Sequence, residues 1–93
     1  MVKTQDSTKA VKLEAKLQKV LWRLEEVERE LRAMEEGWGG SPLLVNLAQY
    51  EHDPVQFNNV VRARSRYLWL QQEIRIHREI AYALMRRLKE VRS

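Results

Sequence analysis

The sequence contains no cysteine, and it has only three glycines and two prolines among 93 residues. Without cysteine there can be no disulfide, no thiolate metal site and no thiol nucleophile. Glycine and proline are the residues that most often interrupt helices, so their scarcity favours an all-α chain with few breaks. No apolar run approaches the roughly 18 residues of a membrane-spanning helix, and residues 1–10 are too polar for a signal peptide. We therefore expect a soluble, cytoplasmic protein without a membrane partner.

Apolar residues instead recur with alternating steps of three and four along residues 53–92, which is the pattern of a heptad repeat. Nine of the ten stripe positions are apolar or aromatic, and His77 is the exception. A second stripe, with all eight positions apolar, runs through residues 8–36. The stripe residues are Ala10, Leu13, Leu17, Val20, Leu24, Val27, Leu31 and Met34, followed by Val60, Ala63, Tyr67, Leu70, Ile74, His77, Ala81, Leu84, Leu88 and Val91. A period of 3.5 predicts that each helix supercoils with a partner helix.

Start and stop signals divide the chain between these stripes. Ser7 or Thr8 can cap the first helix, and Gly37 suits the left-handed position after its end. Ser41-Pro42 and Asp53-Pro54 each combine a capping side chain with proline at the first helical position. These signals predict one domain over residues 1–93, with helices at about 8–36, 42–51 and 54–92.

A connection this short predicts that the two long helices pack as an antiparallel, coiled-coil-like hairpin with a short connecting helix. In a register where facing residue numbers add up to about 101, the expected ion pairs are Glu28–Arg78, Glu14–Arg92, Glu30–Arg66 and Arg23–Glu73. The same register places Lys9 near Arg87, an unfavourable pair.

Two helices alone leave large apolar residues beside the stripes uncovered. We therefore expect the hairpin to assemble with itself into a helical bundle, as a homodimer or a higher oligomer. The residues expected at this interface are Trp22, Leu68, Trp69, Ile76 and Ile80.

The formal net charge of +4 comes from the second half of the chain, since residues 54–93 contain nine basic and three acidic residues. Some arginines can pair with acids of the first helix, but a basic helix can also bind nucleic acid or an acidic protein. Arg64, Arg75 and Lys89 are the cations of one flank that the register leaves unpaired. They are the candidate nucleic-acid contacts, through phosphate groups.

Few polar residues suggest catalysis or metal binding. His77, with Glu73 one turn before it, is explained by a satisfied core histidine, by a pH-sensitive core group or by a polar layer that sets register. Glu51-His52-Asp53 is a dense polar triplet, but adjacent residues rarely converge on one metal ion. No catalytic triad, paired carboxylates or phosphate-binding loop is indicated. We expect no enzyme activity, no cofactor and no metal.

The tripeptide Trp38-Gly39-Gly40 resembles the W-x-G motif of the WXG family of small secreted proteins. Those proteins are similar to this chain in length and in having a helical hairpin with the motif at its turn. The chain departs from the family in three ways: an extra helix follows the motif, Arg86 stands four residues after Tyr82 where the secretion tail has an acidic residue, and the composition is basic. With three residues matched, we assign no family and expect Trp38 to close one end of the bundle.

The sequence thus predicts a non-enzymatic, homo-oligomeric helical scaffold or protein–protein interaction module. The alternative is a small oligomeric DNA- or RNA-binding protein of the plasmid or viral type that uses the basic long helix. The two differ in whether the basic flank forms ion pairs or stays open.

Overall fold

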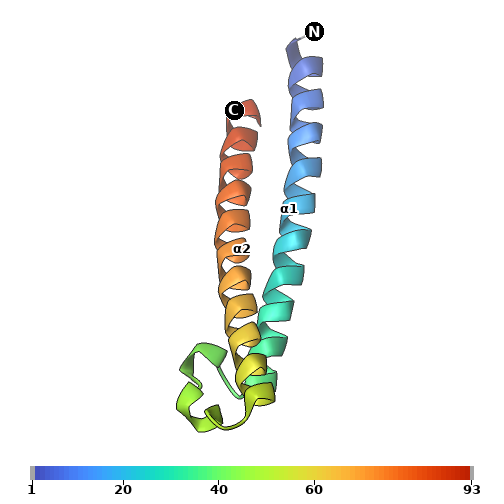
Figure 1. Ribbon diagram of the computed structural model, residues 1–93. Coiled ribbons are helices and arrows are strands. Elements are labelled where there is room, and N and C mark those ends of the chain that lie inside the picture. Colours follow the sequence, from blue (N-terminus) through green and yellow to red (C-terminus); the bar gives the residue numbers. More distant parts are fainter. Residues whose placement is uncertain (1, 93) are drawn as a thin grey trace.

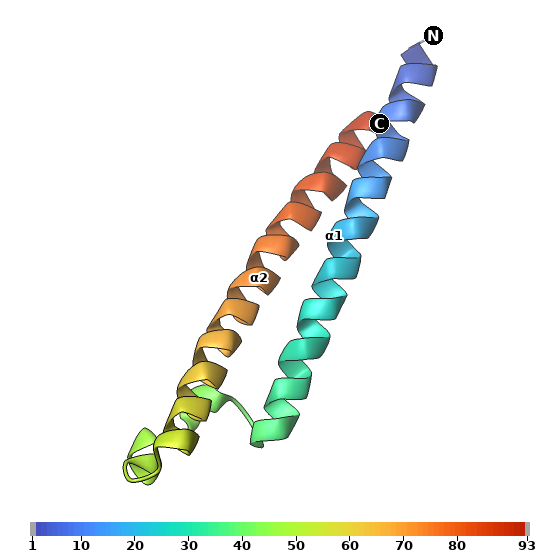
Figure 2. The same cartoon turned by 45° about the vertical axis from the view of Figure 1, so that its right-hand side comes forward.

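Two long helices run side by side in opposite directions, so both ends of the chain lie at one end of the molecule (Figures 1 and 2). This computed structural model describes residues 2–92, and the side chains of residues 8–92. Helices α1 (Val2–Trp38) and α2 (Pro54–Arg92) are joined by two 3₁₀ turns, η1 (Pro42–Leu44) and η2 (Leu47–Tyr50). The predicted all-α class is confirmed. We call the end with the chain termini the open end, and the other the linker end.

The two predicted stripes meet between the helices and form the core. Leu13 of α1 packs with Leu84 and Leu88 of α2 towards the open end, and Val27 packs with Leu70 and Ile74 towards the linker end. Seven of the ten stripe residues of α2 are buried, but only two of the eight in α1 are, and the others are half-buried. One partner helix therefore covers the stripe of α1 incompletely.

Helix α1 is longer at both ends than the sequence predicts. It begins at Val2, not near Thr8, because no glycine or proline between these residues interrupts it. The proposed cap at Ser7 involves a side chain outside those described. At its other end α1 continues through Gly37 to Trp38, which is half-buried.

The predicted left-handed residue at the end of α1 is Gly39, at φ +68°, and not Gly37. The amide of Gly40 donates to the carbonyl of Glu35 at 2.7 Å, and that of Gly39 donates to Glu36 at 3.4 Å. This pair of bonds is a Schellman motif, which satisfies the last carbonyls of the helix.

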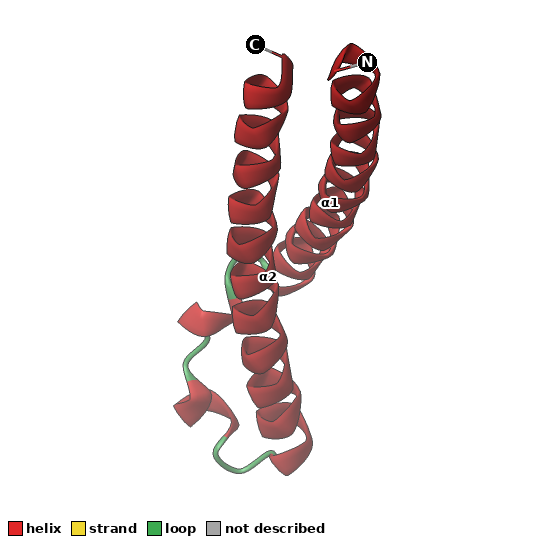
Figure 3. Ribbon diagram, turned by 90° about the horizontal axis from the view of Figure 1, so that it is seen from above, coloured by secondary structure: helices red, strands yellow, loops and turns green. Residues whose placement is uncertain are grey.

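The predicted single helix at 42–51 is wrong, because the linker forms two separate turns beside α2 (Figure 3). Ser41 caps η1 as expected, accepting a bond from the amide of Leu43 at 3.2 Å. The chain is then extended at Val45 and Asn46, and the Asn46 side chain accepts from the Ala48 amide at 3.1 Å. Asparagine competes with the helix in this way through its own side chain. Asp53 caps α2 as predicted, accepting from the Gln56 amide at 3.2 Å.

The molecule is a rod, with extents of 71 × 17 × 14 Å and a radius of gyration of 19.8 Å. A compact domain of this length would have a radius of gyration of about 12 Å. Its accessible surface is 7344 Å², whereas a compact monomer of this mass exposes about 5,700 Å². The excess surface is available for contacts with other molecules.

Candidate functional site

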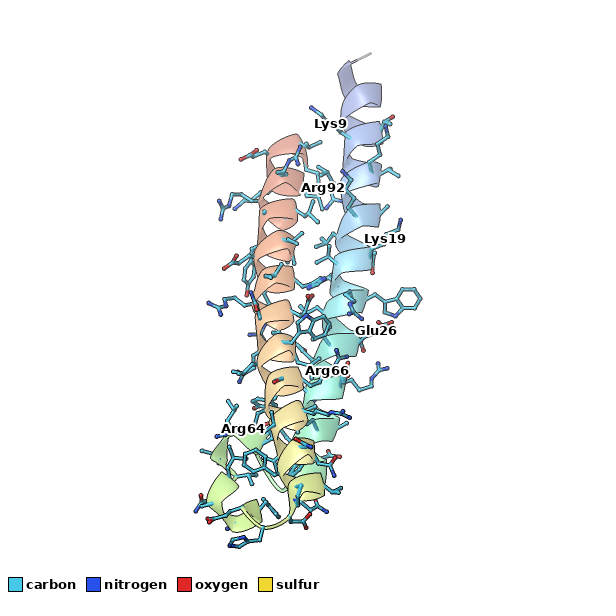
Figure 4. The ribbon with its side chains drawn as sticks, in the orientation of Figure 1. Lys9, Lys19, Glu26, Arg64, Arg66 and Arg92 are labelled. Carbon is cyan, nitrogen blue, oxygen red and sulfur yellow. The ribbon has the colours of Figure 1, made fainter. Side chains whose placement is uncertain are left out.

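Interhelical ion pairs join the two helices on both flanks of the core. On one flank Arg66 contacts Glu30, with its Nη2 atom 2.6 Å from the carboxylate. On the other, Arg78 lies 3.1 Å from Glu28, and Arg92 pairs with Glu14. Figure 4 shows Arg66 between the helices and Arg92 near the open end. These three pairs confirm the predicted register.

The fourth predicted pair, Arg23–Glu73, is wrong. Arg23 binds Glu26 of its own helix at 3.3 Å, and Glu73 lies 3.3 Å from Nδ1 of His77. Both residues contact partners three or four positions away on their own helix, which are neighbours on the helix surface.

Three of the predicted interface residues lie on one side of α2. Trp69, Ile76 and Ile80 are spaced by seven and four residues, so they lie on the same side of the helix. They are 38%, 40% and 41% exposed. The guanidinium carbon of Arg66 lies 4.4 Å from the centre of the Trp69 ring, which orients that ring at one end of the row. We call Trp69, Ile76 and Ile80 the apolar row.

The structure does not bring the other two predicted interface residues to this row. Leu68, which is 53% exposed, lies about 100° around α2 from Trp69. Trp22 is 71% exposed. It lies two residues from both Val20 and Leu24, so it faces away from the core on the far side of α1. Burial of Leu68 and Trp22 requires contact surfaces distinct from the apolar row.

The proposed nucleic-acid contacts do not form a cluster either. Arg64 was expected to be unpaired, but it is half-buried and its Nη2 atom donates to the Leu43 carbonyl at 2.9 Å. Figure 4 shows Arg64 at the linker end. Arg75 is exposed, and Lys89 is exposed beside an apolar hollow that includes Leu17. Arg75 and Lys89 are separated by about 21 Å along the helix.

The fold brings together a different group of cations, which we did not identify as a site from the sequence. Lys9, Lys12 and Lys16 of α1 line one cleft with Arg87 of α2. The cleft lies towards the open end, where Figure 4 labels Lys9. The unfavourable Lys9–Arg87 pair of the predicted register could have indicated this cleft, because it places positive charges of both helices close together.

His77 is held by its own helix. Its Nδ1 atom lies 2.7 Å from the Glu73 carbonyl oxygen. That oxygen can only accept, so Nδ1 carries the hydrogen. His77 is therefore a mostly buried polar residue in the stripe of α2, bonded to its own helix through Nδ1.

The described residues form neither a cluster of metal ligands nor a membrane-spanning helix. Nowhere within 8–92 do three or more potential metal-ligating side chains come together. No helix within residues 2–92 has both the length and the apolar character to cross a membrane.

Comparison of the chain with protein-family models, with curated proteins and with solved structures gives no match. The functional argument therefore rests on the exposed faces of the molecule.

Proposed function

We propose that the chain is a non-enzymatic helical scaffold, an antiparallel hairpin that associates with further copies of itself into a helical bundle. The observation that carries this proposal is the apolar row, Trp69, Ile76 and Ile80, which lies along one side of α2 and is only partly covered by the described part of the chain. A row at heptad-like spacing suits another helix better than a small ligand, because helices pack through residues three and four positions apart.

The composition of the surface supports self-association. Thirteen large apolar side chains are exposed among the described residues, compared with nine apolar residues in the core. The exposed side chains are spread over α1, the linker and α2, and apolar surface of this extent on a soluble protein commonly marks an interface. The half-buried stripe of α1 adds further apolar surface that a second hairpin can cover.

The size of the row limits the strength of the association. Full burial of a large apolar side chain contributes about 1.5–3 kcal/mol, so hiding the remaining exposed part of three residues contributes about 2–4 kcal/mol per copy. Two rows in a symmetric dimer contribute about 4–7 kcal/mol, whereas a micromolar dimer needs about 8 kcal/mol. These contributions alone correspond to a dissociation constant of about 10 μM to 1 mM, and contacts with apolar atoms beside the row would tighten the dimer.

The alternative function, nucleic-acid binding through Arg64, Arg75 and Lys89, has less support. Arg64 already has a bond to the linker, and Arg78 and Arg92 pair with acids of α1. The basic flank of α2 is thus largely used within the chain, which favours the scaffold.

Analytical ultracentrifugation tests the proposal. The wild-type protein should sediment as a dimer or larger species at about 100 μM, and Ile76→Glu/Ile80→Glu should sediment as a monomer that keeps its helix content. The control, Val61→Glu/Tyr82→Glu, adds the same charge at exposed positions on the other flank of α2 and should remain associated. A monomeric wild type, or equal dissociation of both variants, would refute the proposal.

A further inference from the structure

The cleft near the open end combines cations from both long helices above an apolar floor. It has a volume of about 300 Å³ and is lined by Lys9, Lys12, Leu13, Lys16, Arg87, Glu90 and Val91. Four of these seven side chains carry a positive charge and one carries a negative charge. A cleft with this excess of one sign concentrates the field of its charges and attracts ions of the other sign.

Among the side chains that the structure describes, acids offset the charge of these cations only in part. None of the four takes part in the ion pairs described above, and the nearby Glu14 is paired with Arg92 on the opposite flank. Glu90 is the only carboxylate among the lining residues. Lys9 and Arg87 are therefore like charges that line the same cleft, and an anion bound there would reduce their repulsion.

The spacing of the lysines selects for an anion with several charged groups in a row. Lys9, Lys12 and Lys16 are separated by three and four residues, so their backbone positions follow one another at about 4.5–6 Å along the axis of α1. Arg87 approaches from α2 with a planar guanidinium that can bind phosphate oxygens in a bidentate manner. A single carboxylate would engage only part of this set.

We propose that this cleft binds a short chain of phosphate groups. The lysines act as point charges on successive phosphates, and Arg87 orients one of them. No aromatic side chain is among the described residues that line the cleft, so no base has a ring to stack on. Recognition therefore involves the phosphates alone. This site is formed within one chain and does not use the apolar row, so it is independent of the proposed assembly.

Titration calorimetry with inorganic tripolyphosphate at low salt tests the site. The wild type should bind, and its affinity should fall as salt is added. Lys12→Gln/Lys16→Gln/Arg87→Gln should lose more than about tenfold in affinity, because charge-assisted bonds are removed. The matched control, Arg62→Gln/Arg75→Gln/Lys89→Gln, removes the same charge from exposed positions outside the cleft and should lose less than about threefold.

The melting temperature of the cleft variant shows whether weaker binding comes from the loss of the site or from unfolding. The cleft variant removes repulsion between like charges, so its melting temperature without ligand should be no lower than that of the wild type. Displacement of a bound single-stranded oligonucleotide by tripolyphosphate would show that a nucleic-acid backbone occupies the same cleft, and would support the proposal. Failure of the wild type to bind tripolyphosphate, equal losses in both variants, or an oligonucleotide that tripolyphosphate does not displace would overturn it.

Discussion

The guanidinium of Arg64 in α2 donates to the main-chain carbonyl of Leu43 in the linker at 2.9 Å. This bond joins residues 21 positions apart and holds η1 against α2. The Nε atom of the same guanidinium is buried without a partner. Arg64 therefore acts mainly through one bond, and its role is to position the linker.

Replacing Arg64 with methionine should loosen the linker while leaving the helix pair intact. The bond to the Leu43 carbonyl is lost, and with it about 1 kcal/mol of unfolding free energy. Amide hydrogen exchange should accelerate within residues 41–50 and stay unchanged in the core of α2. Arg62→Met, an exposed control two residues away, should change stability by less than about 0.5 kcal/mol. Unchanged exchange in the linker would argue against this role.

Replacing Gly37 or Gly39, at the end of α1, with alanine should change the stability of the protein in opposite directions. Gly37 is helical, and a Cβ atom there would meet no atom within 4 Å. Gly37→Ala should therefore stabilise the protein by about 0.5–1 kcal/mol. Gly39 has φ +68°, so Gly39→Ala should cost about 1–2 kcal/mol. Urea denaturation of both variants measures the difference, and the same sign for both would contradict the assigned helix end.

The Glu30–Arg66 pair should show measurable coupling in a double-mutant cycle. The Nε and Nη2 atoms of Arg66 lie 2.9 and 2.6 Å from one carboxylate oxygen of Glu30. Both side chains are nearly half exposed to solvent. Because of that exposure we expect a coupling energy of only about 0.5 kcal/mol, decreasing with salt. The cycle for Arg23 and Glu73, which face the same flank but bind elsewhere, should give no coupling. Equal coupling in both cycles would show that the observed pairing is not specific.

His77→Leu should stabilise the fold and make the assembly less specific. The side chain is only 18% exposed within the stripe of α2, so leucine adds apolar contact with α1 worth about 1 kcal/mol. A polar residue in a heptad stripe helps to set register, so its removal should broaden the distribution of oligomers. Denaturation and sedimentation measure the two effects, with His77→Gln as a polar control. Lower stability of the leucine variant would mean that the bond to Glu73 contributes more than the apolar contact.

The long helices could be predicted because each carries many apolar residues at one period. A heptad stripe of eight or ten positions adds up many small preferences, and the ion pairs then follow from the register. The two turns of the linker could not be predicted, because a single bond from the Asn46 side chain decides where η2 begins. Local choices of this kind involve small energy differences between alternative hydrogen bonds.

The candidate sites could be predicted only in part, for a similar reason. The apolar row follows from spacing on one helix, whereas the role of Arg64 depends on where the linker lies. The basic cleft requires two helices in register, and its residues look like ordinary solvated lysines on α1 alone. Arg23 shows the opposite error, since a neighbour on its own helix replaced the partner expected across the core.

The opposed, in-register helices also separate charge along the axis of the rod. Residues 9–23 and 78–92, towards the open end, contain ten basic and three acidic residues, whereas residues 24–77 contain six basic and nine acidic. Charges of opposite excess held apart in a molecule 71 Å long produce a permanent electric dipole. Near a polyanion, within a screening length of about 10 Å at 0.1 M salt, the field of the polyanion exerts a torque on this dipole that turns the open end towards it. The molecule should therefore arrive end-on, already oriented, before any side chain makes contact.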